Sequence, residues 1–263
     1  MTTESKLDPS AVIDPSAVLA DDVEVGPFAV IEGGVTIARG CRVAAHAIIR
    51  RFSVLDEDVV VDSFAVVGGL PQDLSFDEAT ESGVRIGKGS VLREGVTIHR
   101  ASEAGRSTSI GLQCLLMANA HVAHDCQLGD GVILANNAML AGHVHVGSGS
   151  FLGGGCGIHQ YVTIGELAMI AGNASVTYDV PSYVTVAERS TVTGLNLLGL
   201  KRKLTPESIA DLRQCYKAVY FQPGNPAKLA AAGEAKSAAG ANFLACFEKS
   251  RRGRFSRSRA QNG

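Results

Sequence analysis

An aliphatic residue recurs at every sixth position over the stretch from Ile110 to Val176. All twelve of these positions carry Val, Leu or Ile: Ile110, Leu116, Val122, Leu128, Leu134, Leu140, Val146, Leu152, Ile158, Ile164, Ile170 and Val176. A period of six matches neither an amphipathic helix, which repeats at about 3.6 residues, nor a half-buried strand, which repeats at every second residue. It predicts a parallel β-helix of hexapeptide repeats, in which each short strand points one aliphatic side chain inward.

The same repeat begins close to the N-terminus. Ten further aliphatic residues lie six apart between Ile13 and Val67, and a small or β-branched residue stands two places before each of them, from Ala11 to Ala65. Such residues suit short strands and the tighter inward positions beside the corners. The predicted fold class is therefore an all-β solenoid, and each of its coils is stabilised by the coils above and below.

Three hexads, or eighteen residues, would close one triangular coil, so residues eighteen apart should stack about 4.8 Å from one another. This rule predicts two neighbouring columns at one corner: His124, Gly142 and Gln160 in the first, and Asp125, His143 and Tyr161 in the second. The core of a β-helix needs no such polar groups. We therefore take this corner as the candidate functional site.

Two segments interrupt the repeat, near 68–83 and 101–108. Residues that leave a coil form surface loops, and loops on a rigid scaffold often carry binding residues. Surface excursions without a function would give the same pattern.

The chain changes character after the β-helix, which we place at 9–186. Thr205 and Pro206 form a helix start, and Ile209, Leu212, Tyr216 and Val219 follow at helical spacing. The Ala-rich stretches Lys228–Ala241 and Asn242–Lys249 predict two more helices. We therefore expect a helical domain at 187–250 that caps the open end of the solenoid, because solenoids need such caps. The basic segment 251–263 is expected to be a disordered tail.

Composition narrows the classes of function. The net charge of −2 argues against a general nucleic-acid binder. No run of eighteen apolar residues predicts a membrane span, and the charged start of the chain resembles no secretory signal. The six cysteines form no Cys-x-x-Cys pair, which suggests free thiols. We expect a cytoplasmic protein.

The corner residues suit acid–base chemistry. His124 could act as a general base, Asp125 could orient it, and His143 could hold a substrate oxygen. Gly142 could offer its backbone N–H to an oxyanion. No serine or cysteine pairs obviously with this base, because Cys126 should face the core. Direct acyl transfer is therefore favoured over a covalent acyl-enzyme.

A metal site is the main alternative. The histidines His121, His124, His143, His145 and His159 are numerous enough for a three-histidine zinc site. Trimeric β-helix carbonic anhydrases bind zinc between their subunits in this way. Spacing alone leaves this alternative open.

Several motifs resemble one enzyme family. They are Asn119–Cys126, Leu134–His143, Ile158–Gln160, Pro71–Leu74, Arg93–Arg100, Asp179–Tyr183 and Gly194–Arg202. Together they closely resemble the UDP-N-acetylglucosamine acyltransferases that begin lipid A synthesis. The resemblance covers nearly the whole chain and is far more specific than the hexad repeat. It implies a homotrimeric left-handed parallel β-helix with a helical cap.

The resemblance also implies a reaction. Acyl carrier protein would donate a 3-hydroxyacyl group to the glucosamine 3-position of UDP-N-acetylglucosamine, with neither cofactor nor metal. His124 matches the general base of the family, Asp125 its partner and Gly142 the oxyanion donor. Substrate contacts are implied for Asp73, His121, His143, Gln160, Asn196 and Arg202. His159 and His99 lie in matching motifs and have no assigned role.

Gly172 matches a position associated with longer acyl chains. It stacks over Gly154, so glycines at both places could equally serve turn geometry alone. The chain departs from the family pattern at Ser75, Leu198 and Lys203. The acceptor group, a 3-hydroxyl or a 3-amine, is left open. A related N-acyltransferase of the same pathway is the alternative enzyme, although that family typically carries an additional N-terminal domain.

Overall fold

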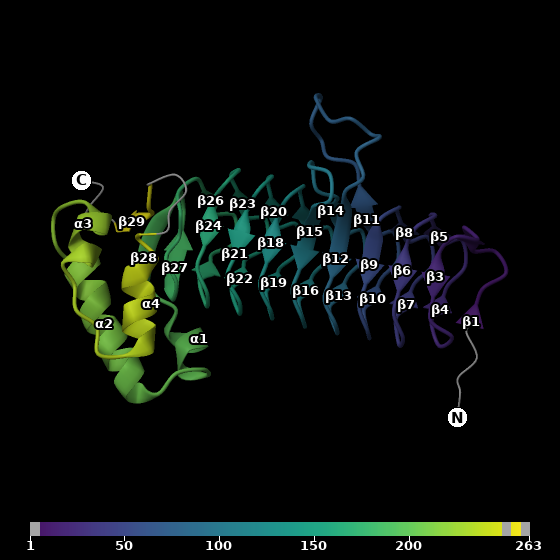
Figure 1. The fold of residues 1–263 in the computed structure, drawn as a ribbon. Coiled ribbons are helices and arrows are strands. Elements are labelled where there is room, and N and C mark those ends of the chain that lie inside the picture. Colours follow the sequence, from purple (N-terminus) through teal and green to yellow (C-terminus); the bar gives the residue numbers. More distant parts are fainter. Residues whose placement is uncertain (1–5, 249–253, 259–263) are drawn as a thin grey trace.

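The computed structural model describes residues 6–248 and 254–258. The chain winds into a long prism whose sides are three parallel sheets (Figure 1). The N-terminal coils lie at one end of the prism, and the helices gather at the other. No helix of the described ranges has the length and apolar character to span a bilayer.

Each coil contributes one short strand to each sheet. Sheet A contains β1 (Lys6–Leu7), β4 (Glu24–Val25), β7 (Arg42–Val43), β10 (Val60–Val61), β13 (Val91–Leu92), β16 (Leu115–Leu116), β19 (Ile133–Leu134), β22 (Phe151–Leu152), β25 (Met169–Ile170), β27 (Val184–Ala187), β28 (Thr191–Leu195) and β29 (Arg257–Ser258). Sheet B contains β2 (Val12–Ile13), β5 (Val30–Ile31), β8 (Ile48–Ile49), β11 (Val66–Gly69), β14 (Thr97–His99), β17 (His121–Val122), β20 (Met139–Leu140), β23 (Gly157–Ile158) and β26 (Ser175–Val176). Sheet C contains β3 (Val18–Leu19), β6 (Thr36–Ile37), β9 (Ser53–Leu55), β12 (Gly83–Ile86), β15 (Ser107–Ile110), β18 (Gln127–Leu128), β21 (His145–Val146) and β24 (Thr163–Ile164).

The register confirms the predicted eighteen-residue coil. Val122 pairs with Leu140, and Leu140 pairs with Ile158, each eighteen residues further along the chain. The hexad residues of these coils are almost inaccessible to solvent: Val122 and Leu140 are 0% exposed and Ile158 is 3% exposed. Each coil therefore buries its inward residues against the coils above and below, as the hexad pattern predicts.

The two interruptions change the register locally. Val67 pairs with Ile98, thirty-one residues away, because residues 70–82 leave the coil between β11 and β12. Ile98 pairs with Val122, twenty-four residues away, because a shorter segment leaves the coil between β14 and β15. After each interruption, the next strand again points its aliphatic residues into the prism. Figure 1 shows the longer segment projecting well clear of the prism.

In the part of the chain that the structure describes, four helices follow the prism: α1 (Leu197–Lys201), α2 (Pro206–Tyr220), α3 (Pro226–Ala231) and α4 (Ala238–Ala245). The predicted start of α2 is confirmed, because the Thr205 side chain accepts from Ser208 N. Helix α4 is joined to the last coils of the prism. Its Asn242 donates to Glu166 Oε1 over 2.7 Å and to the Tyr183 hydroxyl over 2.9 Å.

The prediction of one helix over Lys228–Ala241 is wrong. Helix α3 ends at Ala231, and α4 begins only after Ser237, whose side chain accepts from Gly240 N. The Asp211 carboxylate of α2 accepts from Lys236 N and from Ser237 N, so tertiary contacts with α2 hold the break open. These hydrogen bonds outweigh the helical propensity of the Ala-rich stretch. The sequence pattern could not predict the break, because Asp211 is distant in sequence.

The prediction of a disordered tail over 251–263 is wrong for residues 254–258. Strand β29 pairs with β28, Phe255 is 8% exposed, and its ring lies 4.7 Å from that of Phe247. The burial of Phe255 and the backbone hydrogen bonds to Asp179 both hold this segment. The remaining residues of the predicted tail lie outside the described ranges.

Candidate active site

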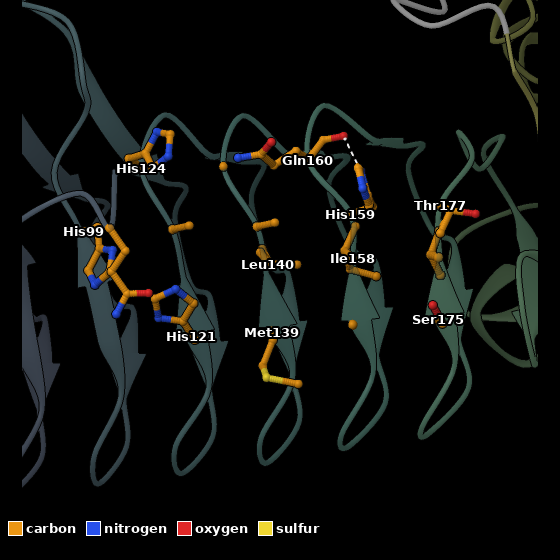
Figure 2. Close-up of a pocket in the computed structure, with 16 residues that line it drawn as sticks. His99, His121, His124, Met139, Leu140, Ile158, His159, Gln160, Ser175 and Thr177 are labelled. Carbon is orange, nitrogen blue, oxygen red and sulfur yellow. Dashed lines mark hydrogen bonds between the residues drawn. The ribbon is translucent and has the colours of Figure 1, made fainter. Parts of the chain in front are cut away.

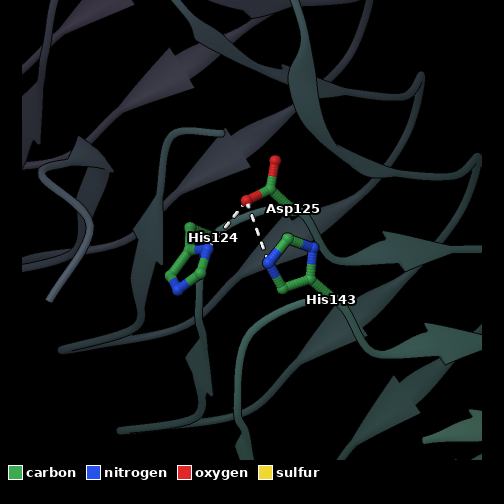
Figure 3. Close-up of side chains that lie close together, drawn as sticks. All are labelled: His124, Asp125 and His143. Carbon is green, nitrogen blue, oxygen red and sulfur yellow. Dashed lines mark hydrogen bonds and ion pairs between the residues drawn. The ribbon is translucent and has the colours of Figure 1, made fainter. Parts of the chain in front are cut away.

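His124 and Asp125 form the turn between β17 and β18, at the corner where sheets B and C meet. Asp125 has a φ of 60°, a left-handed conformation that few non-glycine residues adopt. His124 Nδ1 lies 2.7 Å from Asp125 Oδ2, and both side chains are only 9% exposed (Figure 3). With Nδ1 as the donor to the carboxylate, Nε2 of His124 is left to accept a proton.

Asp125 is held by residues of the second interruption. Ser102 donates to its carboxylate from the backbone N over 3.2 Å and from Oγ over 2.6 Å. Burial raises the pKa of Asp125, but the hydrogen bonds from His124 and Ser102 outweigh burial and lower this pKa to about 2. Asp125 is therefore a carboxylate at neutral pH.

The backbone of Asp125 is anchored as well, because its N–H donates to Thr108 Oγ1 over 2.8 Å. Sequence reasoning missed both Ser102 and Thr108. Ser102 lies twenty-three residues before Asp125, outside the eighteen-residue register, so no spacing rule places it there. Thr108 lies seventeen residues before Asp125, where the register has resumed, so the spacing could have found it.

His143 lies one coil above Asp125, as predicted. Its Nε2 is 3.7 Å from Asp125 Oδ2 (Figure 3), and its ring stands perpendicular to that of His124 at 5.1 Å. The ring of Tyr161, one coil further on, stacks on His143 at 4.5 Å. All three members of this column have a φ close to 60°. The predicted column is therefore confirmed, and its stacking fixes the orientation of the His143 ring.

Gly142 lies directly beside the His124 ring. A Cβ at this position would lie 2.6 Å from Cε1 and 2.7 Å from Nε2 of His124, so any other residue would displace the imidazole. Within the described residues, the Gly142 N–H donates no hydrogen bond. This N–H is therefore left to donate to a ligand, and Gly142 lines the same cavity as His124.

A cavity of about 460 Å³ extends from this corner along the outer surface of sheet B (Figure 2). Its walls come from β17, β20, β23 and β26. Gln72 adds to them from residues 70–82, the segment between β11 and β12 that we call the long insertion. Three histidines (His99, His121 and His124) line one end, Met139 and Ile158 lie in the middle beside Gln160 and His159, and Ser175 and Thr177 line the far end (Figure 2). The cavity is therefore elongated and of mixed polarity, with histidines at the end where His124 lies.

Two more histidines, His99 and His121, line the same end of the cavity as His124. His121 Nδ1 lies 2.8 Å from Thr97 Oγ1, and its ring meets that of His99 edge-on at 4.7 Å. Burial, with the neighbouring histidines second, lowers the pKa of His99 to about 4. Burial also lowers the pKa of His121. Both rings are therefore neutral at pH 7, and they can orient a ligand without adding charge.

Cys126 is excluded as a nucleophile in this site. It is 0% exposed, its Sγ lies 3.2 Å from Ala141 O, and burial raises the pKa of its thiol to about 12. The prediction that this side chain faces the core is confirmed. A buried protonated thiol cannot attack a thioester at the surface.

His124, Asp125 and His143 could also hold a metal ion, since one ligand atom from each lies within 4.8 Å of the others. The sequence suggested a zinc site of three histidines, whereas this group contains two histidines and a carboxylate. However, the Oδ2 atom of Asp125 already accepts from His124 and from Ser102 Oγ. A metal would have to compete with both donors.

Of the remaining predicted residues, Gln160 belongs to a predicted column, whereas His159 and Asp73 do not. Gln160 lines the cavity, and so does His159, whose Nδ1 lies 3.2 Å from Gln160 O (Figure 2). Asp73 lies in the long insertion next to Gln72, and its carboxylate accepts from both N and Oγ of Ser75. Ser75 therefore orients Asp73.

Six predicted residues are not among those that line this cavity: Asp73, Asp125, His143, Gly172, Asn196 and Arg202. Asn196 caps α1: its Oδ1 accepts from Gly199 N over 3.1 Å, and its Nδ2 donates to Leu167 O over 2.9 Å. Arg202 is exposed at the end of the same helix. Gly172 lies at the corner between β25 and β26, so it and His124 bound opposite edges of sheet B.

Comparison with known proteins places the chain first in the class of hexapeptide-repeat transferases. The family described as bacterial transferase hexapeptide (six repeats) matches residues 16–51 and 107–142, and the hexapeptide repeat of succinyl-transferase matches 143–178. Domain 2 of Udp N-acetylglucosamine O-acyltransferase matches residues 179–255.

Whole-chain relatives give the particular family. Acyl-[acyl-carrier-protein]–UDP-N-acetylglucosamine O-acyltransferase of Syntrophobacter fumaroxidans is 42% identical over 83% of this chain and 86% of the relative. The enzyme of the same name from Trichlorobacter lovleyi is 44% identical over 81% and 83%. The structure of UDP-N-acetylglucosamine acyltransferase from Campylobacter jejuni superimposes with a TM-score of 0.90 at 34% identity, over 97% of this chain and 100% of that one.

The chain belongs to the acyl-[acyl-carrier-protein]–UDP-N-acetylglucosamine O-acyltransferase family. It is accordingly an acyltransferase, and the hexapeptide families and the matched structures indicate that its parallel solenoid is a left-handed β-helix.

Proposed function

We propose that this protein transfers a 3-hydroxyacyl group from acyl carrier protein to the 3-hydroxyl of UDP-N-acetylglucosamine, the first step of lipid A synthesis. The observation that carries the proposal is the contact between His124 and Asp125. It fixes the imidazole with Nε2 beside Gly142, at the histidine-lined end of an elongated cavity. The names of the relatives supply the two substrates.

The geometry supports one direct displacement. His124 Nε2 takes the proton of the acceptor hydroxyl as its oxygen attacks the thioester carbonyl. The carbonyl oxygen gains the negative charge, and the Gly142 N–H donates to it. When the C–O double bond re-forms, the C–S bond breaks and the thiolate leaves. The proton on His124 then passes to the thiolate, so the imidazole is neutral again after each turnover.

The same arrangement favours transfer without a covalent acyl-enzyme. The thiol nearest His124 in sequence, Cys126, is buried and faces the core. His121 and His143 lie on either side of the base and offer ring nitrogens for sugar hydroxyls. Gln160 and Asp73 offer an amide and a carboxylate for further contacts.

A complete site requires neighbouring chains. Asn196 and Arg202, proposed for the nucleotide, lie outside the cavity that holds His124. A cavity on one flat side of a prism is also shallow, and a second prism laid against it would form a deep cleft. We therefore propose a homotrimer in which each site combines groups from adjacent chains. We further propose a solenoid over 9–186 with the helices of 187–250 as its cap.

The decisive experiment is acyl transfer from 3-hydroxyacyl-acyl carrier protein to UDP-N-acetylglucosamine, with the 3-amino analogue as a parallel acceptor. Acylation of the 3-hydroxyl supports the proposal. Acylation of the amine alone would contradict the acceptor and favour an N-acyltransferase. Light scattering on the same preparation tests the trimer, and full activity in a monomer would contradict a shared site.

A further inference from the structure

A second cavity, of about 360 Å³, lies against the long insertion and has no part in the site described above. Arg50, Arg51 and Arg100 line it, together with Glu32 and with Glu78 of the insertion. Gly68 lines it as well, where a Cβ would lie 2.5 Å from Ser53 Oγ. The cavity is therefore enclosed mainly by charged side chains.

Hydrogen-bond donors without acceptors gather here. Arg100 is 1% exposed, and only its Nη2 has a partner, the carbonyl oxygen of Glu78 at 2.8 Å. Within residues 6–248 and 254–258, four buried atoms have no hydrogen-bond partner at this place: Nε and Nη1 of Arg100, Nε of Arg50 and Oγ of Ser53. Each of them can donate. Buried donors of this kind are rare, because leaving them unpaired destabilises the fold.

The charges of the residues that line this cavity also favour an anion. Three arginines face two glutamates, so the lining carries an excess of one positive charge. Glu32 already accepts from the backbone N–H of Arg51 over 3.0 Å. Burial first, and Arg51 second, lower the pKa of Arg100, as expected for a cation with too few negative neighbours.

Two aromatic rings hold the guanidinium of Arg100 in place without satisfying its donors. Its Cζ lies 5.8 Å from the ring centre of Phe52 and 5.2 Å from that of Phe76. Such contacts attract a cation but accept no conventional hydrogen bond. The arginine is therefore positioned in advance for an anion.

From these contacts we propose that the cavity between Arg50, Arg51 and Arg100 binds a phosphate group. A tetrahedral oxyanion offers four acceptor oxygens to donors that have none, and arginine forks match phosphate geometry. Binding would also hold the insertion in place, because Phe76 and Glu78 contact Arg100 from that segment. The same segment carries Gln72, which lines the reaction cavity.

The test uses the full chain with inorganic phosphate, against sodium chloride at the same ionic strength. Thermal unfolding and calorimetry should show saturable stabilisation by phosphate. Arg50→Gln and Arg51→Gln should weaken phosphate binding about tenfold or more. Glu78→Gln should strengthen it, because a repelling carboxylate is removed. Hydrogen exchange in residues 70–82 should slow when phosphate is bound.

Two control variants separate this cavity from other phosphate contacts. Arg85→Gln removes an exposed cation from β12, and Arg202→Ala removes the cation proposed for the nucleotide; both should retain the phosphate effect. A phosphate monoester as a second arm distinguishes a free ion from an esterified group: equal affinity assigns the free ion, and tighter binding assigns the ester. No stabilisation beyond that of chloride, or equal stabilisation in Arg50→Gln and Arg51→Gln, would overturn the proposal.

Discussion

The Nδ1 atom of His124 lies 2.7 Å from Oδ2 of Asp125, and this contact leaves only Nε2 of the imidazole to face the reaction cavity. The pair are neighbours in sequence, yet their geometry depends on the left-handed turn at Asp125. A carboxylate whose pKa is lowered to about 2 keeps its charge throughout the working pH range of an imidazole base.

We expect His124→Ala to lower kcat by about 10²–10⁴-fold, because the general base is lost. The fold should be retained, since this side chain lies at a turn outside the aliphatic stack. Circular dichroism and light scattering provide the control. A variant within threefold of the wild-type rate would show that the base lies elsewhere. A chelator should leave the wild-type rate unchanged, whereas inhibition reversed by zinc would support a metal at His124, Asp125 and His143.

Ser102→Ala should raise the pKa of Asp125 toward its ordinary value, because a hydroxyl donor to the carboxylate is removed. A lowered pKa stabilises the folded state above the ordinary value of 3.8, and this stabilisation is lost as the pH falls toward about 2. The variant should therefore be less stable than wild type at pH 7 by about 1–2 kcal/mol. Denaturant unfolding at several pH values should show this difference shrinking below pH 4.

Ser102→Thr is the matched control, since it retains the hydroxyl, and it should restore most of the stability. A Ser102→Ala difference that stays constant from pH 7 to pH 3 would show that the serine acts through packing alone.

Gly142→Ala should lower kcat by about 10²-fold or more, because the new methyl group must move the imidazole away from the acceptor. Gly194→Ala is the matched control: a Cβ at Gly194 meets no atom within 4 Å. Steady-state kinetics on both variants measures the effect. Equal rates for the two would contradict the close approach of Gly142 to His124.

Gly172→Met should shift the preferred acyl donor to a shorter chain. A larger side chain at this corner would block the far end of sheet B, and each methylene left in water costs about 0.8 kcal/mol. Competition among acyl carrier protein thioesters of graded length measures the preference. An active variant with the parental preference would show that Gly172 serves the turn alone.

Arg202→Ala should raise the KM for the nucleotide sugar by about tenfold or more while kcat changes little, because a phosphate contact acts on ground and transition states alike. Arg213→Ala, an exposed cation on α2, should leave both constants near wild type. A collapsed kcat with an unchanged KM would contradict the proposed role of Arg202.

The periodic part of this protein is determined by its sequence. One inward aliphatic residue in every six and one coil in every eighteen give the strands, the core and the register between Val122 and Leu140. The same arithmetic correctly stacks Asp125, His143 and Tyr161. It succeeds because each coil contacts only its neighbours, so spacing along the chain translates directly into position in space.

The positions of the segments outside that repeat depend on tertiary contacts. Ser102 contacts Asp125, Asp211 breaks the Ala-rich helix, and Phe255 packs against Phe247, and none of these contacts follows from the repeat. The unpaired donors of Arg50 and Arg100 meet in the same way, because residues 70–82 return to the prism at a point that no period specifies. Contacts between segments of irregular length depend on how the folded surfaces fit together. The spacing of residues along the chain therefore does not predict these contacts.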